Sequence, residues 1–463
     1  MNLPCEFENR MKALLGAEYG DFVSSLSKEA VRALRVNTNK ISVPDFQKIC
    51  DFAISPIAYC TEGFTFSEEH IGSHPLHLSG AFYSQEPAAM APVECARIAP
   101  GMKILDVCAS PGGKSTQAAA KLGAEGVLVA NEIDPARART LLSNVERLGF
   151  GNIIVTNTDS AALKRAYRAY FDLVLVDAPC SGEGMMRKNS LAVSEWSIEN
   201  IEKCALRQHE ILENASQTVA PGGCLLYSTC TYAPEENEMQ IDKFLTEHED
   251  FSLLPVPEKI KNVTSDGIVP PGSSRTELTL CRRFYPHKTP GEGQFMALLC
   301  RKNIPEAVLP AEKQKKKEKN GKKVKKDPGE HIIRDFLCDV LTEEGLRYAD
   351  GKKLIKTGEK FFLCPDICLP ESGVKAAGVA VGEVRKGRVI PEHHFFMAYG
   401  SMFKRKIELS AESEDALRYL HGETIKTDTE NGFAAVFVGG CTAGGAKVSG
   451  GEAKNYYPKG LRI

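Results

Sequence analysis

The chain has 463 residues, of which 43% are hydrophobic and 25% charged, so it can bury several cores. The net formal charge is only −2, so the total charge does not indicate a nucleic-acid partner. Such a partner has to be inferred from where the charges cluster. No run of about 18 apolar residues occurs and the first residues are mixed and charged, so the sequence predicts neither a transmembrane helix nor a secretion signal and favours a cytoplasmic location.

Residues 1–80 have the pattern of a small mixed α+β domain, which we assign to RNA binding. MKALLGAEYGDFVSSLS (11–27) and AVRALRVNT (30–38) both show helical apolar spacing, with polar breaks between them. The sequence therefore predicts two helical segments at the start of the chain.

Residues 81–303 alternate short apolar runs with helical patterns. The predicted strands are MKILDVCA, GVLVANEID, NIIVTNTD, FDLVLVDAP, GGCLLYSTC and FMALLCRK. The predicted helices are TQAAAKLG, PARARTLLSNVERLG and the segment from Glu199 to Val219. Such alternation is typical of an α/β fold with a doubly wound, mostly parallel sheet.

The composition changes after residue 303. Residues 304–329 include a run with nine lysines (312–326), which predicts a solvated linker that could also follow a phosphate backbone. Residues 330–385 then predict a small C-terminal domain, and residues 386–463 a second strand-rich unit.

Fifteen cysteines are present, but none is arranged as a zinc site. No C-x2-C pair occurs, and Cys364 and Cys368, the nearest approach, have no partner His or Cys close in sequence. We therefore expect free thiols in a reducing compartment, and no metal.

The stretch DVCASPGGKST (106–116) looks like a phosphate-binding loop but does not fit G-x4-G-K-[ST]. Cys108 occupies the position of the first glycine, and Pro111 removes a backbone donor. An apolar strand leads into a glycine-containing turn and a helix, so the backbone can approach a ligand at the carboxyl end of the strand. The loop therefore predicts a ligand other than a nucleoside triphosphate.

Polar residues also end the next three strands, at the same edge of the predicted sheet. Glu132 lies where a carboxylate hydrogen-bonds ribose hydroxyls, Asp159 is placed to face an adenine amino group, and Asp177 ends the fourth strand. This set predicts a pocket for S-adenosylmethionine.

Cysteines follow two of the strands, Cys180 in DAPCSGEG and Cys230 in YSTCTYAPEENE. A thiolate added to carbon 6 of cytosine makes carbon 5 nucleophilic toward a sulfonium methyl, and a second thiol can assist the release of the product. Asp177 is placed to stabilise charge on the ring, and Lys114 and Lys188 are candidates to support a thiolate. Spacing alone does not decide which cysteine attacks.

Together these motifs resemble the RNA cytosine-5 methyltransferases of the Sun family. ALRVNTNK (33–40), YSQEPAAM (83–90) and RRFYPHKTPGEGQF (282–295) add to the resemblance, which covers roughly residues 30–302. One departure is ASPGGK where the family more often has AAPGGK. YLHGET and AKNYYPKGLR in the tail further resemble the RsmF-type bacterial branch, which modifies small-subunit ribosomal RNA and ends in a PUA-like RNA-binding domain.

The resemblance implies a role for each residue of the site. It makes Cys230 the nucleophile, lets Cys180 help release the product, and puts Asp177 between cofactor and target base. Glu132 would take the ribose and Asp159 the adenine. The loop that would hold the methionine end of the cofactor consists of Cys108, Ala109, Ser110, Pro111, Gly112, Gly113 and Lys114.

Basic and aromatic residues alternate in the last thirteen residues, a composition that suits phosphate contact and base stacking. With Lys188, the predicted RNA-binding residues are Lys454, Tyr456, Tyr457, Lys459 and Arg462. We expect a monomer that methylates cytosine in 16S ribosomal RNA. A transfer RNA methyltransferase and a non-catalytic ribosome assembly factor are the alternatives.

Overall fold

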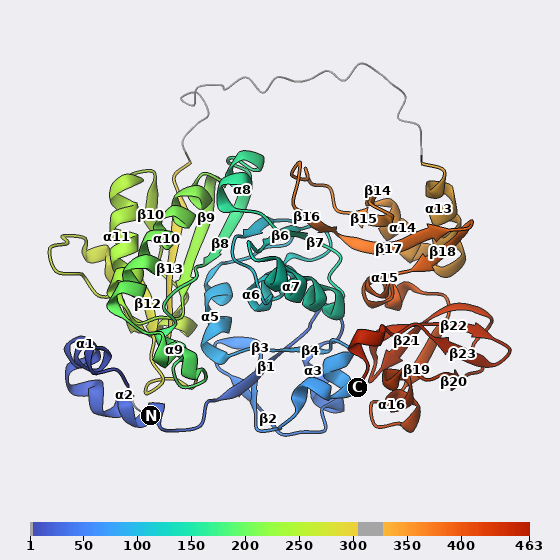
Figure 1. The fold of residues 1–463 in the computed structure, drawn as a ribbon, viewed down its shortest axis with the longest axis horizontal. Coiled ribbons are helices and arrows are strands. Elements are labelled where there is room, and N and C mark those ends of the chain that lie inside the picture. The colour runs from blue at the N-terminus through green and yellow to red at the C-terminus, as the bar shows by residue number, and fades with distance from the viewer. Residues whose placement is uncertain (1–2, 304–326) are drawn as a thin grey trace, which may run out of the picture.

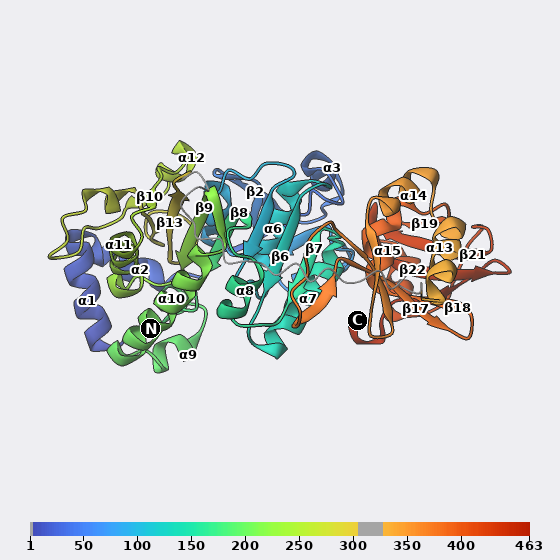
Figure 2. The ribbon, with the colours of Figure 1, turned by 90° about the horizontal axis from the view of Figure 1, so that it is seen from above.

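The computed structural model describes residues 3–303 and 327–463. The predicted linker, residues 304–329, lies outside the described residues apart from its last three. The chain forms an elongated molecule with its largest sheet in the middle and the C-terminal part at one end (Figures 1 and 2). No helix within residues 3–303 and 327–463 combines the length and apolarity needed to span a bilayer.

The N-terminal helices α1 (Cys5–Leu15) and α2 (Tyr19–Leu26) confirm the first helical prediction. Phe7 packs against Trp196 and Phe22 against Tyr232, and both partners belong to the region of residues 81–303. Trp196 is 8% exposed, so the single tryptophan is a packing residue.

The second helical prediction was wrong, because residues 32–36 form strand β1 (Arg32–Val36). This strand lies inside a four-stranded sheet of order β2-β3-β1-β4. Leu34 and Val36 are buried on one face and Ala33 and Arg35 on the other. A strand that is buried on both faces lacks the alternation of apolar and polar residues that marks a half-buried strand. A short segment of such a strand therefore also matches the apolar spacing of a helix. The other strands of this sheet are β2 (Ile54–Ile57), β3 (Cys60–Phe66) and β4 (Phe82–Ser84). The same part of the chain contains the helices α3 (Val43–Ile49) and α4 (Pro75–Leu78).

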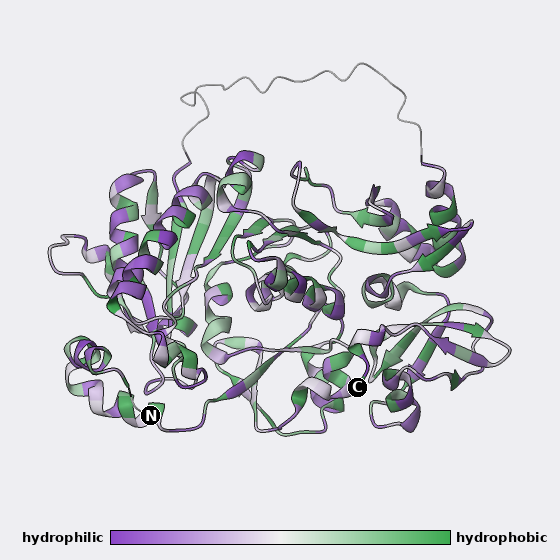
Figure 3. Cartoon of the chain, viewed as in Figure 1, coloured by the Kyte–Doolittle hydropathy of each residue, from purple (hydrophilic) through white to green (hydrophobic). Residues whose placement is uncertain are grey.

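The central sheet has ten strands, with the order β11-β12-β13-β9-β8-β5-β6-β7-β16 and β10 paired to β13. Strands β9, β8, β5, β6 and β7 are parallel, which confirms the doubly wound prediction. The parallel strands are coloured mostly hydrophobic, whereas α10 and α11 show hydrophilic outer faces (Figure 3).

All six predicted strands of this region are present. The strands of the sheet are β5 (Lys103–Asp106), β6 (Val127–Asn131), β7 (Ile153–Thr156), β8 (Phe171–Asp177), β9 (Val219–Thr229), β10 (Phe251–Leu253), β11 (Ser265–Asp266), β12 (Arg282–Phe284) and β13 (Gln294–Arg301). The helices are α5 (Pro87–Cys95), α6 (Gly113–Leu122), α7 (Pro135–Leu148), α8 (Ser160–Ala166), α9 (Ser190–Ser194), α10 (Ile198–Ser216), α11 (Glu238–Glu247) and α12 (Glu258–Lys261).

The last strand of the central sheet comes from the C-terminal part of the chain. Strand β16 (Val374–Ala377) pairs antiparallel with β7, so that Val374 lies opposite Thr156 and Ala377 opposite Ile154. The C-terminal part is therefore joined to the catalytic part through a shared sheet.

Two smaller sheets make up the rest of the C-terminal part. The first has the order β14-β15-β17-β18 and the second the order β19-β21-β22-β23-β20. The division into domains remains a prediction, but the β17–β18 hairpin crosses residue 385 and extends the first sheet to Pro391. The strands are β14 (Lys353–Thr357), β15 (Lys360–Cys364), β17 (Val379–Arg385), β18 (Arg388–Pro391), β19 (Lys406–Leu409), β20 (Ile425–Lys426), β21 (Gly432–Val438), β22 (Cys441–Ser449) and β23 (Glu452–Asn455), and the helices are α13 (Gly329–Val340), α14 (Glu343–Asp350), α15 (His393–Tyr399) and α16 (Glu414–His421).

Lys40 joins the three parts of the molecule. Its ammonium donates to the backbone carbonyls of Ser79 at 2.8 Å, Arg147 at 3.2 Å and Thr442 at 2.8 Å. His394, on α15, lies nearby and contacts the carbonyl oxygen of Phe150 at 3.1 Å. Because buried carbonyls need donors, these contacts fix the C-terminal part against the other two.

Candidate active site

A cavity of about 650 Å³ opens at the carboxyl ends of the parallel strands. The ends of β6 and β8 and the segments that follow β5, β7 and β9 line it, together with residues of α10. Among the predicted residues it is lined by Cys108, Ser110, Glu132, Asp159, Asp177, Cys180 and Cys230. The structure thus brings both cysteines and five of the ten predicted cofactor-binding residues to one cavity, whereas Ala109, Pro111, Gly112, Gly113 and Lys114 are not among its lining residues.

The loop between β5 and α6 contributes Val107, Cys108 and Ser110 to the lining of this cavity. Gly112 has φ of 112°, a left-handed conformation that favours glycine, and a Cβ there would lie 3.1 Å from Leu141. Asp106 is 1% exposed and accepts a hydrogen bond from Ser115 Oγ at 2.6 Å. Burial raises the pKa of Asp106 to about 7, and its Oδ1 atom has no partner.

Lys114 reaches from the first turn of α6 to Asp177 at the end of β8. Its Nζ atom lies 2.8 Å from Asp177 Oδ2, and Ser228 Oγ donates to the other carboxylate oxygen at 2.8 Å. Burial acts to lower the pKa of Lys114, and the neighbouring Asp177 carboxylate outweighs it, so the pKa is raised. These two contacts hold the Asp177 carboxyl group in one orientation at the cavity.

The two cysteines are in contact. Cys180 Sγ and Cys230 Sγ lie 3.3 Å apart, and both line the cavity. The hydrogen bond with Cys230, together with burial, raises the pKa of the Cys180 thiol. Either sulfur can act as the donor in this contact.

Glu132 and Asp159 lie at the opposite end of the cavity. Glu132 accepts a hydrogen bond from the backbone N–H of Asp134 at 3.0 Å and lies 3.4 Å from Arg137. Asp159 caps α8 by accepting from the Ala162 N–H at 2.6 Å. Asp159 thus has a structural role as a helix cap beside any role toward a ligand.

Sequence reasoning missed two groups of residues at this site. Arg207, Glu210 and Ile211 of α10 line the cavity, but no strand-end pattern points to them. Glu183 and Glu236, each at most 3% exposed, lie behind the two cysteines. The only sequence signal for the second group was the pair of acid-rich segments SGEG and PEENE.

Two motifs that carry the resemblance, ALRVNTNK (33–40) and RRFYPHKTPGEGQF (282–295), hold structural elements together and do not line the cavity. Arg35 donates to Gln85 at 2.9 Å and to Thr116 Oγ1 at 2.8 Å, which docks β1 onto α6. Arg283 pairs with Glu238 and donates to the carbonyl of Tyr232 at 2.8 Å. The second contact supports the chain two residues after Cys230.

The structure corrects one of the predicted RNA-binding residues. Tyr457 is 2% exposed and packs against His393 and Tyr419, so it cannot stack on a base. Tyr456 is half-buried against Phe433. Burial of the tyrosines anchors the tail, while the three exposed basic residues remain predicted RNA contacts: Lys454, Lys459 and Arg462.

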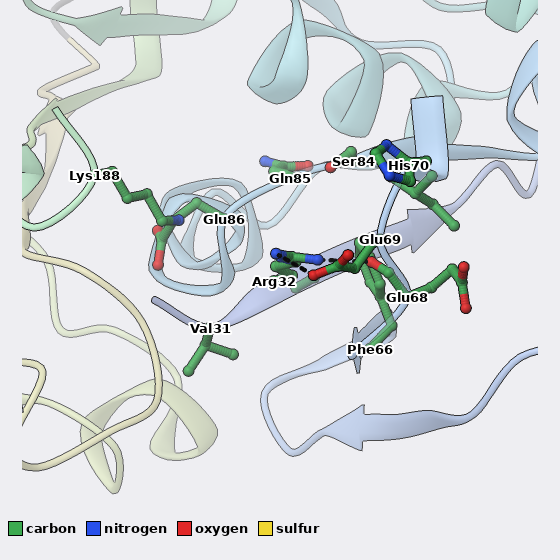
Figure 4. A pocket seen from close by; sticks show the side chains of 12 residues that line it. Val31, Arg32, Phe66, Glu68, Glu69, His70, Ser84, Gln85, Glu86 and Lys188 are labelled. Carbon is green, nitrogen blue, oxygen red and sulfur yellow. Dashed lines mark hydrogen bonds and ion pairs between the residues drawn. The ribbon is translucent and has the colours of Figure 1, made fainter. Parts of the chain in front are cut away.

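Lys188 lies away from the cysteines, at a hollow of about 440 Å³ between the N-terminal sheet and the catalytic part (Figure 4). Its Nζ atom lies 3.7 Å from Glu292, and Glu86 faces it from the hollow. Glu68 and Glu69 line the other side, with Glu69 3.8 Å from Arg32. The RNA-binding role of Lys188 remains a prediction, and no contact supports its proposed action on a thiolate.

Comparison with known families covers most of the chain. The description "16S rRNA methyltransferase RsmB/F" matches residues 95–300, "N-terminal domain of 16S rRNA methyltransferase RsmF" matches residues 3–87, and "Methyltransferase RsmF PUA domain" matches residues 404–463. These matches confirm the predicted resemblance.

Individual relatives agree with the family matches. Ribosomal RNA small subunit methyltransferase F of Klebsiella pneumoniae is 31% identical over 99% of this chain and 96% of its own length. The protein of the same name from Erwinia tasmaniensis is 30% identical, over 99% and 96%. A solved methyltransferase homologue from Pyrococcus horikoshii is 31% identical and has a TM-score of 0.57, over 64% of this chain and 94% of its own.

Proposed function

The chain belongs to the family of RsmF-type 16S ribosomal RNA methyltransferases, and from this premise we propose how its residues perform the reaction. The enzyme transfers a methyl group from S-adenosylmethionine to carbon 5 of a cytosine in 16S ribosomal RNA. Cys230 attacks carbon 6 of that cytosine, Cys180 assists release, and Asp177 holds the base. The 3.3 Å contact between two thiols beside the cavity carries this proposal.

The cavity fits the cofactor in size and in the placement of its polar groups. A volume of about 650 Å³ is within the range of small-molecule sites. Glu132 at the end of β6 would hold the ribose, Asp159 the adenine, and the backbone of the 108–114 loop the methionine end. When bound there, S-adenosylmethionine supplies an electrophilic methyl group on a sulfonium.

The family resemblance assigns the attack to Cys230. The thiolate is the attacking species, and the 3.3 Å contact allows the S–H of Cys180 to donate to Cys230 Sγ and so support a negative charge on it. The ammonium of Lys114, bonded to Asp177, lies close enough to act on the charge of Cys230.

Cys180 changes character once Cys230 is bonded to carbon 6. The two effects of Cys230 that raise the pKa of Cys180, its hydrogen bond and its charge, disappear when Cys230 becomes a neutral thioether. Cys180 can then release its own proton to water. Once carbon 5 carries the methyl group, the Cys180 thiolate accepts the proton from carbon 5, and the electrons of that C–H bond re-form the ring double bond as the Cys230–C6 bond breaks. Cys230 leaves as a thiolate and the product is released.

Asp177 orients the target base. With one oxygen bonded to Lys114 and the other to Ser228, the carboxylate is fixed at the cavity while 34% of its side chain stays exposed. It would accept a hydrogen bond from the exocyclic amine of cytosine, which favours the addition of the thiolate. The target base must be unpaired or flipped out of a helix to reach it.

The remaining properties follow from the family and from the site. Ribosomal RNA as substrate is consistent with activity in the cytoplasm, and we propose that one chain suffices because the two cysteines, Asp177 and the loop all belong to it. The alternatives of a transfer RNA target and of a non-catalytic assembly factor lose support, since the relatives are named for small-subunit ribosomal RNA.

The test is transfer of a labelled methyl group to 16S ribosomal RNA and, in parallel, to transfer RNA. Label is expected in 5-methylcytosine of the ribosomal RNA only, and Cys230→Ser is expected to abolish it while leaving binding of S-adenosylmethionine within about threefold. Full activity of Cys230→Ser, or label in transfer RNA alone, would overturn the proposal.

A further inference from the structure

Each cysteine loop carries a glutamate that holds the other loop. Glu236, six residues after Cys230, accepts the backbone N–H of Ser181 at 2.9 Å and also contacts the Ser181 hydroxyl. Glu183, three residues after Cys180, accepts the Thr231 hydroxyl at 3.0 Å and the backbone N–H of Tyr232 at 3.0 Å. Ser181 and Thr231 are the residues directly after the two cysteines.

The two hydroxyls also touch, which joins these contacts into one line. Ser181 Oγ lies 2.9 Å from Thr231 Oγ1, so four oxygens follow one another from Glu236 through Ser181 and Thr231 to Glu183. We call these four residues the crossed carboxylate network. All four are buried, with exposures of 0%, 8%, 1% and 3% in that order.

Counting hydrogens shows that the network holds an extra proton. Its three oxygen–oxygen contacts need three hydrogens, because two adjacent oxygens without one would repel each other. The hydroxyls of Ser181 and Thr231 supply two. The third hydrogen must come from a carboxyl group, so one of the two glutamates is protonated.

The surroundings place this proton on Glu236. Burial raises the pKa of Glu183, but this carboxylate accepts three donors, including Trp196 Nε1 at 2.8 Å, and these donors and the guanidinium of Arg10 on α1 favour its charged form. Glu236 receives Ser181 N–H and Gln208 Nε2 on one oxygen, which leaves the other oxygen to donate to Ser181.

Other titratable groups also face the network. On Glu236 these are Cys180, Cys204 of α10 and Tyr227, whose hydroxyl donates to the Glu236 carbonyl at 2.7 Å. Arg10 is bonded to Glu235 at 2.6 Å and so is shared between the acids of this region. None of these groups gives Glu236 a direct cationic partner.

We propose that the crossed carboxylate network, with its proton on Glu236, is a positioning device that keeps Cys180 and Cys230 in contact. The inference rests on the proposed function of these cysteines and adds residues that touch neither substrate nor cofactor. Glycines allow the close approach: a Cβ at Gly184 would lie 2.9 Å from the carbonyl oxygen of Cys230.

The two glutamates must respond differently to replacement by glutamine. In Glu236→Gln the amide NH2 can donate to Ser181 Oγ, as the protonated acid does, while the amide oxygen accepts from Ser181 N–H and Gln208. In Glu183→Gln both positions are acceptors of N–H donors, so either orientation sets the amide NH2 against Trp196 or Tyr232. The same chemical change is thus tolerated at one site and disruptive at the other.

The test measures contact between the thiols without depending on activity. Phenylarsine oxide reacts with two adjacent thiols, forming two As–S bonds and releasing one water. Because Cys224 and Cys300 face each other across β9 and β13, all variants would carry Cys300→Ser. Cys180→Ser in the same background defines the signal of the remaining single thiols, and circular dichroism with S-adenosylmethionine binding confirms the fold of each variant.

Capture at the Cys180–Cys230 pair is expected at the parent rate in Glu236→Gln and at least about tenfold slower in Glu183→Gln. Methyl transfer should follow the same order, and the decline of transfer at alkaline pH should weaken in Glu236→Gln because an amide keeps its hydrogen. Equal capture in both variants, or a loss in Glu236→Gln alone, would overturn the inference. If capture follows the predicted order but the parent forms no adduct with cytosine, the proposed function fails while the positioning device stands.

Discussion

Asp106 offers a quantitative test of how the cofactor loop is built. Its buried carboxyl receives Ser115 Oγ at 2.6 Å and has an unpartnered Oδ1 atom. Replacing it by asparagine removes the ionisable group and keeps an oxygen for Ser115. The prediction concerns how the free energy of unfolding of the two proteins differs as pH changes.

The magnitude follows from the pKa of Asp106, which burial raises from 3.8 to about 7. Between pH 3.8 and about 7 the folded protein holds the Asp106 proton and the unfolded protein does not. The free energy of unfolding therefore falls as pH rises through this range. Between about pH 5.5 and pH 7.5 the linkage amounts to about 2 kcal/mol, at about 1.4 kcal/mol for each pKa unit. Asp106→Asn carries no such dependence.

The assay is urea unfolding of both proteins at the two pH values, followed by fluorescence of Trp196. Other groups titrate equally in both proteins, so the difference between them isolates Asp106. Stability of the wild type relative to Asp106→Asn is expected to fall by about 2 kcal/mol from pH 5.5 to pH 7.5. A difference that stays constant within about 0.5 kcal/mol would refute a buried, neutral Asp106.

Two further predictions address the support of the cysteine loop and the tail. Arg283→Met, which leaves the fully buried Glu238 without its cationic partner, is expected to lower the free energy of unfolding by about 3–5 kcal/mol. Arg283→Met with Glu238→Met should recover part of this loss, and equal loss in both variants would contradict the argument. Replacing Lys454, Lys459 and Arg462 by alanine is expected to reduce the slope of log affinity for 16S ribosomal RNA against log salt by about 2–3. Filter binding measures this slope, and Tyr457→Phe is the control in which it should not change. An unaltered slope in the triple variant would exclude the tail as a phosphate contact.

The central fold could be predicted because its signals are local. Each parallel strand is a short apolar run followed by a helical pattern, and all six predicted strands occur in the structure. Strand β1 was missed because its two buried faces erase the alternation that identifies a strand. The place of β16 beside β7 could not be predicted, since the pairing joins residues more than 200 positions apart through backbone hydrogen bonds that carry no residue signature.

At the site, too, residues with a local sequence signal could be predicted, and residues placed only by the fold could not. Cys180, Cys230 and Asp177 follow apolar strands, so the sheet brings them to one edge as predicted. Glu183 and Glu236 look like ordinary surface acids in the sequence, and only the fold turns them inward behind the cysteines. Tyr457 was predicted to stack on bases because it lies among basic residues, but it follows β23 and packs against His393 and Tyr419, contacts that local composition does not reveal.

Mass spectrometry of the covalent protein–RNA complex tests the central claim most directly. Cys180→Ser incubated with 16S ribosomal RNA and S-adenosylmethionine is expected to accumulate a complex whose cross-linked peptide contains Cys230, because addition proceeds and release does not. The double variant Cys180→Ser with Cys230→Ser should form none. A cross-link at position 180 in Cys230→Ser, with none at Cys230 in Cys180→Ser, would show that the other thiol attacks and would contradict the account.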